Sequence, residues 1–457
     1  MKKILFTLGI CYSSIFADTI TFDKALKETL NNNHELKVKQ LEIEKSKADL
    51  QNARGMVLGE LKFNENISRS NNPLHVFGMK LGSREADFGD FGFADFLAWQ
   101  QNGMQGDILT MQPNDLNHPE ARKNYETKLS YQLPLFTGFK LSSAQDMAKL
   151  QVKANTAKYN YDKKQLSLEV LKAYNGAVAA KYFISATQKA KKATSSFVNF
   201  ANEMHKEGYV TQIDIDQASV YDLKIDAMLL EAKNKFALAI AYLKFLTNNK
   251  TITDVNGFQN LMVDNTLLEK LQNDALAKRD DLEWMQHNTQ TMKEKINFEK
   301  SGNLPMIGAY GEYGYNDNQF DNLNSDKDYY TFAVGLEYKL FDGLTTSSNI
   351  EKAKIEYAKM NHYTAMMEDG IKLQVEKAYL NLKTKNAILE QKQKAQNLAF
   401  SVLEKSEELY KNQLIKMNDL LLEQANAQKA EAETIMAKYE QTIAVAELQL
   451  ATGNSLE

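Results

Sequence analysis

The chain has 457 residues, of which 43% are apolar and 25% are charged, and its formal net charge at pH 7 is −4. This balance is typical of a protein that folds in water, and it lacks the basic excess of a nucleic-acid-binding protein. The six histidines show no metal-ligand spacing, and no phosphate loop or nucleophile motif is present. The sequence therefore predicts neither an enzyme nor a cofactor.

The first residues predict export. Two lysines precede a short apolar run, and a polar turn leads to Ala17 just before Asp18. This is the pattern of a secretory signal peptide over residues 1–17, with a retained amphipathic start as the alternative. The only cysteine, Cys11, lies in this segment, so the mature chain has no disulfide. No later apolar run reaches the length of a transmembrane helix.

Helical and strand patterns alternate through the first half of the mature chain. Residues 22–58 have a helical composition with an interruption at the asparagine run 31–33. Apolar and polar residues then alternate at 61–68 and at 125–135, which is the period of a β-strand. Residues 139–247 lack proline and are rich in straight-chain helix formers, which predicts a helical hairpin with one break at 207–211.

This helical hairpin occurs twice. When the sequence is shifted by 205 positions, residues 139–247 fall on 344–452 without a gap, and the motif LxVxKAY at 168–174 falls on the same motif at 373–379. The second copy breaks at 412–416, at the matching place. An offset that holds over the whole hairpin indicates a duplicated structural unit. Two unrelated coiled coils of similar composition are the alternative.

The second half repeats the order of the first. Residues 248–266 look irregular, one helix is expected at 267–300, and two alternating runs follow within 305–341. The mature chain thus divides into a first repeat at 18–247, an irregular equatorial connection at 248–266 and a second repeat at 267–457. Alternating runs of about ten residues rich in tyrosine are typical of outer-membrane strands. In the last run the expected lipid-facing side chains are Tyr330, Phe332, Val334, Leu336 and Tyr338.

The four predicted strands are too few to close a barrel. In lipid, an open sheet edge leaves unpaired backbone groups that the bilayer does not tolerate. If the sheet lies in a membrane, other copies of the chain must therefore complete it. The alternative is a water-soluble antiparallel sheet with one face on a core. The sequence offers no further β-elements to form the second layer of such a sandwich.

The order of these elements, with the duplication, resembles the TolC family of outer-membrane efflux and secretion channels. Local motifs that carry the resemblance are QLPLF at 132–136, Leu304-Pro305 before the third strand and Gly208-x5-Asp214. The resemblance covers essentially the whole mature chain. It implies a mainly α-helical fold with a small antiparallel β part, in which three identical chains form an α-barrel from their long hairpins and one shared transmembrane β-barrel from their strands.

The resemblance also implies a location and partners. The barrel would contact outer-membrane lipid of a Gram-negative bacterium, and most of the chain would lie in the periplasm. A periplasmic adaptor protein and an inner-membrane transporter would complete a tripartite efflux pump or a type I secretion system. An exported coiled-coil scaffold or adhesin without a pore is the competing hypothesis, and it would be soluble without detergent.

In the family, polar links between neighbouring hairpins hold the periplasmic end closed. The matching positions are Asp214 in the first hairpin and Tyr410 in the second, with Gly208 at the first turn. Asp419 matches an acidic position that narrows the entrance. The alternative is that Asp214 and Asp419 only cap the return helices, where aspartate is favoured.

Two family gate positions differ in this chain. Ile415 stands where an arginine is found in the best-known members, and Leu422 stands where a second acidic ring is expected. We therefore expect a gate that is weaker or differently charged.

Residues 70–124 form a long segment between the first two strands. Aromatic residues lie there among glycines and aspartates, and they are Phe77, Phe88, Phe91, Phe93, Phe96 and Trp99. We expect an external loop that folds over the barrel mouth and is ordered by its aromatic side chains. A disordered surface insertion is the alternative, which so many aromatic residues disfavour.

Overall fold

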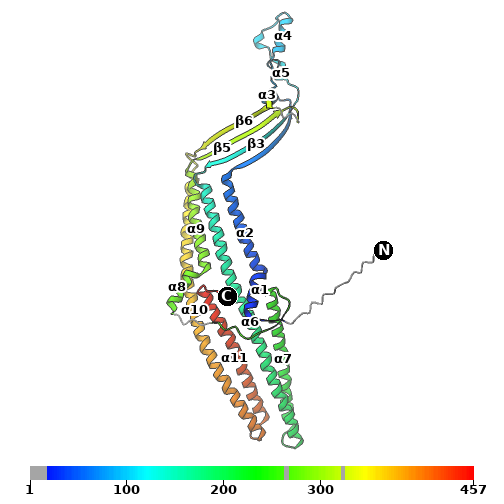
Figure 1. Ribbon diagram of the computed structural model, residues 1–457, viewed down its shortest axis with the longest axis vertical. Coiled ribbons are helices and arrows are strands. Elements are labelled where there is room, and N and C mark those ends of the chain that lie inside the picture. The colour runs from blue at the N-terminus through cyan, green and yellow to red at the C-terminus, as the bar shows by residue number, and fades with distance from the viewer. Residues whose placement is uncertain (1–17, 262–266, 321–324, 457) are drawn as a thin grey trace, which may run out of the picture. The chain divides into compact units, whose positions relative to one another are not determined.

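The computed structural model describes residues 18–261, 267–320 and 325–456, which form two compact units (Figure 1). The helical unit contains residues 18–45, 153–288 and 361–456, and the sheet unit contains residues 46–152 and 289–360. The predicted signal peptide lies outside the described residues. The mainly helical fold with a small antiparallel sheet confirms the predicted fold class.

Two helical hairpins account for most of the chain. Helix α6 (Lys140–Lys206) returns as α7 (Gln212–Thr247), and α10 (Thr345–Lys411) returns as α11 (Met417–Ala451). Both predicted breaks are present, and the helix ends on either side of them keep the offset of 205 residues. Within the helical unit α7 packs against α11.

A shorter pair of helices precedes each pair of long strands. The first pair is α1 (Phe22–Asn32) and α2 (His34–Gly55), followed by a 3-10 turn, and the second pair is α8 (Leu268–Lys278) and α9 (Asp280–Lys300). The predicted interruption near residues 31–33 is confirmed. The prediction of one unbroken helix at 267–300 is wrong, because Arg279 has an extended backbone and separates two helices.

The two breaks, at Asn33 and Arg279, make the same kind of contact. The Asn33 amide donates to the carbonyl of Leu246 at 3.3 Å, and the Arg279 guanidinium donates to the carbonyl of Ala451 at 3.3 Å. Leu246 and Ala451 lie 205 residues apart, at the ends of α7 and α11. Each break therefore satisfies a carbonyl that the return helix leaves without an intrahelical partner.

The connection predicted to be irregular at 248–266 contains a short strand. β4 (Ile252–Val255) pairs in parallel with β1 (Asp18–Ile20), so the prediction is wrong for these residues. Four residues carry too little periodicity to be recognised as a strand. The strand pair lies on the main core of the helical unit, where Tyr174 is buried with its ring edge-on to Phe22, at a centroid distance of 5.9 Å.

The sheet unit contains four antiparallel strands in the order β2-β3-β5-β6, as Figure 1 shows in part. Their bounds are Glu60–Ser70, Arg122–Phe136, Met306–Asp317 and Asp328–Glu337. All four predicted strands are present. The edge strands are β2 and β6, and among the described residues neither pairs with a further strand along its outer edge.

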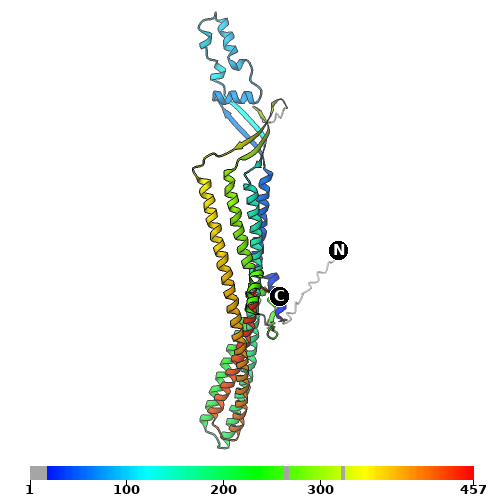
Figure 2. The same cartoon turned by 90° about the vertical axis from the view of Figure 1, so that its left-hand side faces the viewer.

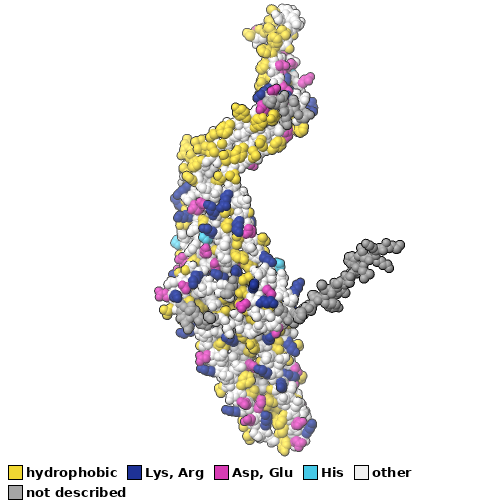
Figure 3. All heavy atoms as spheres, viewed as in Figure 1, with side chains coloured by type: hydrophobic (Ala, Val, Ile, Leu, Met, Phe, Trp, Pro, Cys, Tyr) yellow, Lys and Arg dark blue, Asp and Glu magenta, His cyan; other side chains and the backbone are white. Residues whose placement is uncertain are grey.

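The two faces of this sheet differ in chemistry. One face carries cross-strand apolar pairs such as Phe63 with Leu129, and Tyr313 with Tyr330. The opposite face carries charged and hydroxyl groups that bond across strands, such as Tyr329 with Glu126 at 2.9 Å. Figure 3 shows hydrophobic side chains gathered over the sheet. Alternation along each strand therefore produces one apolar and one polar face.

The segment between β2 and β3 is folded and stands at one end of the sheet (Figure 2). It contains three α-helices, which are α3 (Pro73–Gly82), α4 (Phe93–Gln101) and α5 (Asn114–Asn117). Aromatic rings contact one another along it, including Phe77 with Phe91 at 5.5 Å between centroids. This agrees with a loop ordered by its aromatic residues.

Ion pairs fix the base of the loop to the β5–β6 connection. Glu85 bonds to both Arg122 and Lys327, and the guanidinium of Arg84 donates to the backbone carbonyls of residues 326 and 328.

None of the helices in the described part of the chain combines the length and the apolar character needed to cross a membrane.

Candidate functional site at the hairpin ends

Each hairpin turns through one residue in the left-handed conformation. Gly208 has φ of 79° and Gln413, which is 205 residues later, has φ of 63°. In both turns the next residue donates its backbone N–H to a carbonyl five residues earlier, Tyr209 to Met204 and Leu414 to Leu409, each at 2.9 Å. This is the Schellman pattern that ends a helix. Gly208 therefore has a clear backbone role, and the copy keeps that geometry with a glutamine.

The two aspartates lie in the first turn of the return helices and cap them. The Asp214 carboxylate accepts hydrogen bonds from the backbone N–H of Thr211 at 2.9 Å and from its hydroxyl at 2.8 Å. The Asp419 carboxylate accepts from the backbone N–H of Lys416 at 3.2 Å. Negative charge at this end of a helix also complements its dipole. Capping is therefore present at both positions, and a further role at a channel entrance stays a prediction.

Tyr410 is buried at the end of the second hairpin, with 5% of its surface exposed. Its ring packs edge-on to Phe200 of α6, at a centroid distance of 5.8 Å, in an apolar cluster that includes Met417 and Leu420. Its hydroxyl has no hydrogen-bond partner among the described residues. Burial, with the charge of Asp214 nearby, raises the pKa of Tyr410. Within one chain, Tyr410 and Asp214 are close but not hydrogen-bonded.

The two departures from the family pattern lie on different surfaces. Ile415 packs against the apolar cluster around Tyr410, whereas the side chain of Leu422 is 57% exposed. Neither position carries a charge or a hydrogen-bonding side chain. The polar groups that the family resemblance leads us to expect at the gate are therefore Tyr410 and the two capping aspartates.

A partly exposed ion cluster joins the helices of the first hairpin, and sequence reasoning missed it. Lys191 of α6 bonds to Asp222 of α7 at 2.8 Å and to Asp226 one turn further along. Asp222 also accepts from the hydroxyl of Thr194 at 2.6 Å. The available signal was the pair of aspartates four residues apart, which places both carboxylates on one helix face.

The second hairpin lacks this cluster. The positions that match Lys191, Asp222 and Asp226 are Gln396, Ala427 and Glu431. Its helices are joined instead by Lys392 with Glu433 and by Lys385 with Glu440, each at 2.7 Å. The two hairpins therefore share a backbone plan but are bonded differently.

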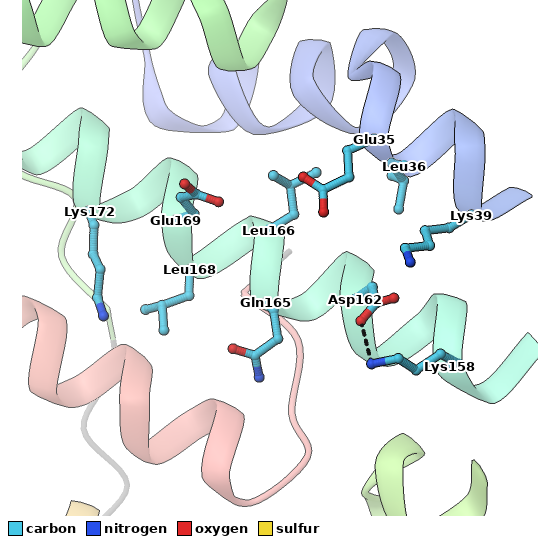
Figure 4. Close-up of a pocket in the computed structure, with 10 residues that line it drawn as sticks. All are labelled: Glu35, Leu36, Lys39, Lys158, Asp162, Gln165, Leu166, Leu168, Glu169 and Lys172. Carbon is cyan, nitrogen blue, oxygen red and sulfur yellow. Dashed lines mark ion pairs between the residues drawn. The ribbon is translucent and has the colours of Figure 1, made fainter.

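A charged cavity of about 440 Å³ lies between α2 and α6 in the helical unit (Figure 4). Lysines and carboxylates alternate around it, including the ion pair of Lys158 with Asp162 at 2.9 Å. Glu169, also in its wall, accepts a hydrogen bond from Tyr242, and this bond with burial raises the pKa of Tyr242 to about 12. The mixed charges favour no single class of ligand. No group of metal-ligating side chains is present among the residues that the structure describes.

The predicted lipid-facing residues of β6 lie on the apolar face of the sheet. Tyr330, Phe332, Val334 and Leu336 are exposed and pair with β5 residues of that face, while Tyr338 lies just beyond the end of the strand and is also exposed. On the other face, the Thr331 hydroxyl donates to Glu312 at 3.0 Å. Contact of the first set with lipid stays a prediction.

Known structures share this architecture. The chain superposes on CusC with a TM-score of 0.77 at 13% identity, over 95% of this chain and 92% of CusC. For the Campylobacter jejuni CmeC outer membrane channel the TM-score is 0.76 at 15% identity, over 94% and 85%. For the open state of the Neisseria gonorrhoeae MtrE outer membrane channel it is 0.75 at 18% identity, over 95% and 89%. These likenesses establish the fold.

Family membership rests on the sequence. No curated protein matches the chain. The model of the family described as "Outer membrane efflux protein" matches residues 25–249 and 271–454, one segment in each repeat. Both matched segments contain a strand pair and a helical hairpin. The chain therefore belongs to the outer membrane efflux protein family.

Proposed function

We propose that three copies of the chain assemble into one continuous duct, the exit of a tripartite efflux pump or a type I secretion system. As a member of its family, the chain is an outer-membrane protein that serves efflux. The observation that carries the assembly is the four-stranded sheet with an apolar face and two unpaired edges, β2 and β6. In lipid such edges must pair, and copies of the same chain supply matching edges.

Apolar stripes on the helical unit support a ring. The outward face of α7 exposes large apolar side chains at near-heptad spacing, which are Ile213, Val220, Leu223, Leu230, Leu238 and Phe245. α10 exposes a second stripe, which is Met366, Leu373, Leu380, Leu398, Val402 and Leu409. In Figure 1 these two helices lie on opposite sides of the helical unit. Head-to-tail contact of unlike faces is the arrangement that closes rings of identical subunits.

The hairpin ends are the proposed gate. Tyr410, whose buried hydroxyl has no partner among the described residues, would bond the nearby Asp214 carboxylate in the closed assembly, and Asp419 would contribute negative charge at the entrance. The same ends are the proposed contact for a periplasmic adaptor protein, which would join the duct to an inner-membrane transporter. The proposal leaves the identity of the exported substrate open.

The first experiment separates a duct from a pore-free scaffold. The chain should fractionate with the outer membrane, require detergent for extraction, migrate as a trimer before heating, and conduct ions in a planar bilayer. A chain that is soluble without detergent would identify the scaffold. A trimer without conductance, even after changes at the hairpin ends, would contradict the duct.

The gate is tested by Tyr410→Phe, which removes only the hydroxyl. We expect higher conductance with unchanged trimer stability, because a hydrogen bond to a partly shielded charged group contributes about 1.5–3 kcal/mol and the ring packing stays intact. Tyr209→Phe, an exposed change at the first turn, is the matched control. Asp419→Ala should reduce any cation preference. If Tyr410→Phe conducts like the parent, another contact holds the end closed.

A further inference from the structure

A groove with a cavity volume of about 580 Å³ lies between the two hairpins. Its walls come from α6 of the first hairpin and from α10 and α11 of the second. Phe400 and Leu403 with three alanines of α6 form an apolar part of the lining. A cavity of this size holds a small organic molecule.

Two amide side chains in this groove each have one polar atom without a hydrogen-bond partner among the described residues. Gln424 is 4% exposed, and its Oε1 has no partner among the described residues. One turn along α11, the Nε2 of Gln428 also has none, while its Oε1 accepts a long hydrogen bond of 3.5 Å from the Tyr221 hydroxyl. A buried unsatisfied polar group costs stability, so folded proteins rarely keep one without a partner. Both amides lie where a bound molecule would contact them.

The charged lining of the groove is mainly negative. Glu404 and Glu407 come from α10 and Glu431 from α11, against the single positive charge of Lys189 on α6. Burial raises the pKa of Glu431, and Lys189 only partly offsets this. The carboxylate of Glu431 is therefore poorly solvated, and a positively charged partner would stabilise it.

We propose that this groove binds an amphiphilic organic cation, with its apolar body against Phe400 and Leu403 and its charged nitrogen among the carboxylates and the Gln424 oxygen. The first copy does not repeat this set of amide and carboxylate groups. The positions that match Gln424 and Gln428 in the first copy are Ser219 and Leu223, and the position that matches Glu431 is Asp226, which is already paired with Lys191. A ligand here contacts α6 as well as α10 and α11, so it links the two hairpins.

The test uses the full-length chain purified in a non-ionic detergent, with ethidium as the aromatic cation and the anion 1-anilinonaphthalene-8-sulfonate as the charge control. Binding is measured by calorimetry and by ethidium fluorescence. We expect saturable binding of ethidium and none of the anion. Glu407→Gln and Glu431→Gln should each weaken ethidium about tenfold or more, because each removes a charge-assisted contact without changing size. Glu408→Gln, outside the groove lining on the same helix, should stay within about twofold.

Gln424→Leu distinguishes a binding role from a structural one. It removes an unsatisfied buried group, so the unliganded protein should unfold at the same or a higher temperature while ethidium affinity falls. A lower unfolding temperature with unchanged affinity would mean that Gln424 only supports the fold. Equal ethidium affinity in all variants, or equally tight binding of the anion, would overturn the site. Neither result depends on conductance, so the duct function is tested separately.

Discussion

Arg279 holds the break between α8 and α9 through a buried charge, and its removal should be unusually costly. The guanidinium, 7% exposed, donates to both carboxylate oxygens of Asp281 at 2.9 and 2.6 Å and to Gln374 at 2.7 Å. Arg279→Ala leaves the largely buried Asp281 carboxylate without its charged partner. Loss of one member of a buried pair costs about 3–5 kcal/mol, which is a large part of a typical folding free energy.

The matching change in the first repeat removes no charge. Asn33→Ala deletes the bond to the Leu246 carbonyl and the cap on the N–H groups of Glu35 and Leu36. A cap and a neutral hydrogen bond are each worth about 1 kcal/mol, so we expect a loss of about 2 kcal/mol. Arg279→Ala should therefore lower the free energy of unfolding about twice as much as Asn33→Ala.

The two changes are compared by unfolding each purified variant in denaturant and monitoring the loss of helix by far-ultraviolet circular dichroism. Arg279→Ala combined with Asp281→Ala is the decisive variant, because it removes the stranded charge. It should be more stable than Arg279→Ala alone. The opposite outcome is a loss in free energy of unfolding that equals the sum of the losses of the two single variants. In that case the ion pair does not fix the break, and our attribution of the Arg279→Ala loss to the ion pair is wrong.

Three further predictions follow from the sheet, the first hairpin and the loop. Val334→Arg should destabilise the membrane-inserted protein by about 2–4 kcal/mol if the residue lies near mid-membrane, whereas Thr331→Ala on the polar face should be mild, as measured by unfolding in lipid vesicles. Burial acts to raise the pKa of Asp222, but hydrogen bonds from Lys191 and two hydroxyls outweigh it and place the pKa below its ordinary 3.8. The stability from this carboxylate is present above pH 3.8 and is lost as pH falls through the lower folded value, so acid titration should show a hairpin transition there that Lys191→Met abolishes. Glu85→Gln should loosen the base of the loop and speed its cleavage by trypsin, and cleavage at the parent rate would show that the ion pairs do not hold it.

Much of the fold follows from local patterns in the sequence. The strands are predictable because alternation along β3 and β6 matches the two faces of the sheet. The hairpin breaks are predictable because the two repeats share a fixed offset. Gly208 is a turn signal in the first repeat, and the offset then places the second turn at Gln413, although glutamine alone does not indicate a turn.

What could not be predicted depends on contacts between distant residues. Arg279 is a good helix former, and only its bonds to Asp281 and to the end of α11 explain the break. The family resemblance predicts a gate role for Tyr410, but the burial of its ring against α6 depends on how the two hairpins pack. The groove around Gln424 is likewise formed by three helices, and none of them alone shows it.

The duplication with unequal bonding has a consequence for symmetry. The proposed ring of three chains would contain six hairpins, so its backbone would approach sixfold symmetry while its chemistry would be only threefold. In that ring every second hairpin would carry the Lys191 cluster, and the hairpins between them would not. The six hairpins would therefore form two sets of three, and heat or acid would unfold one set before the other. At that stage every second hairpin of the ring would be unfolded, and the three hairpins between them would still be folded.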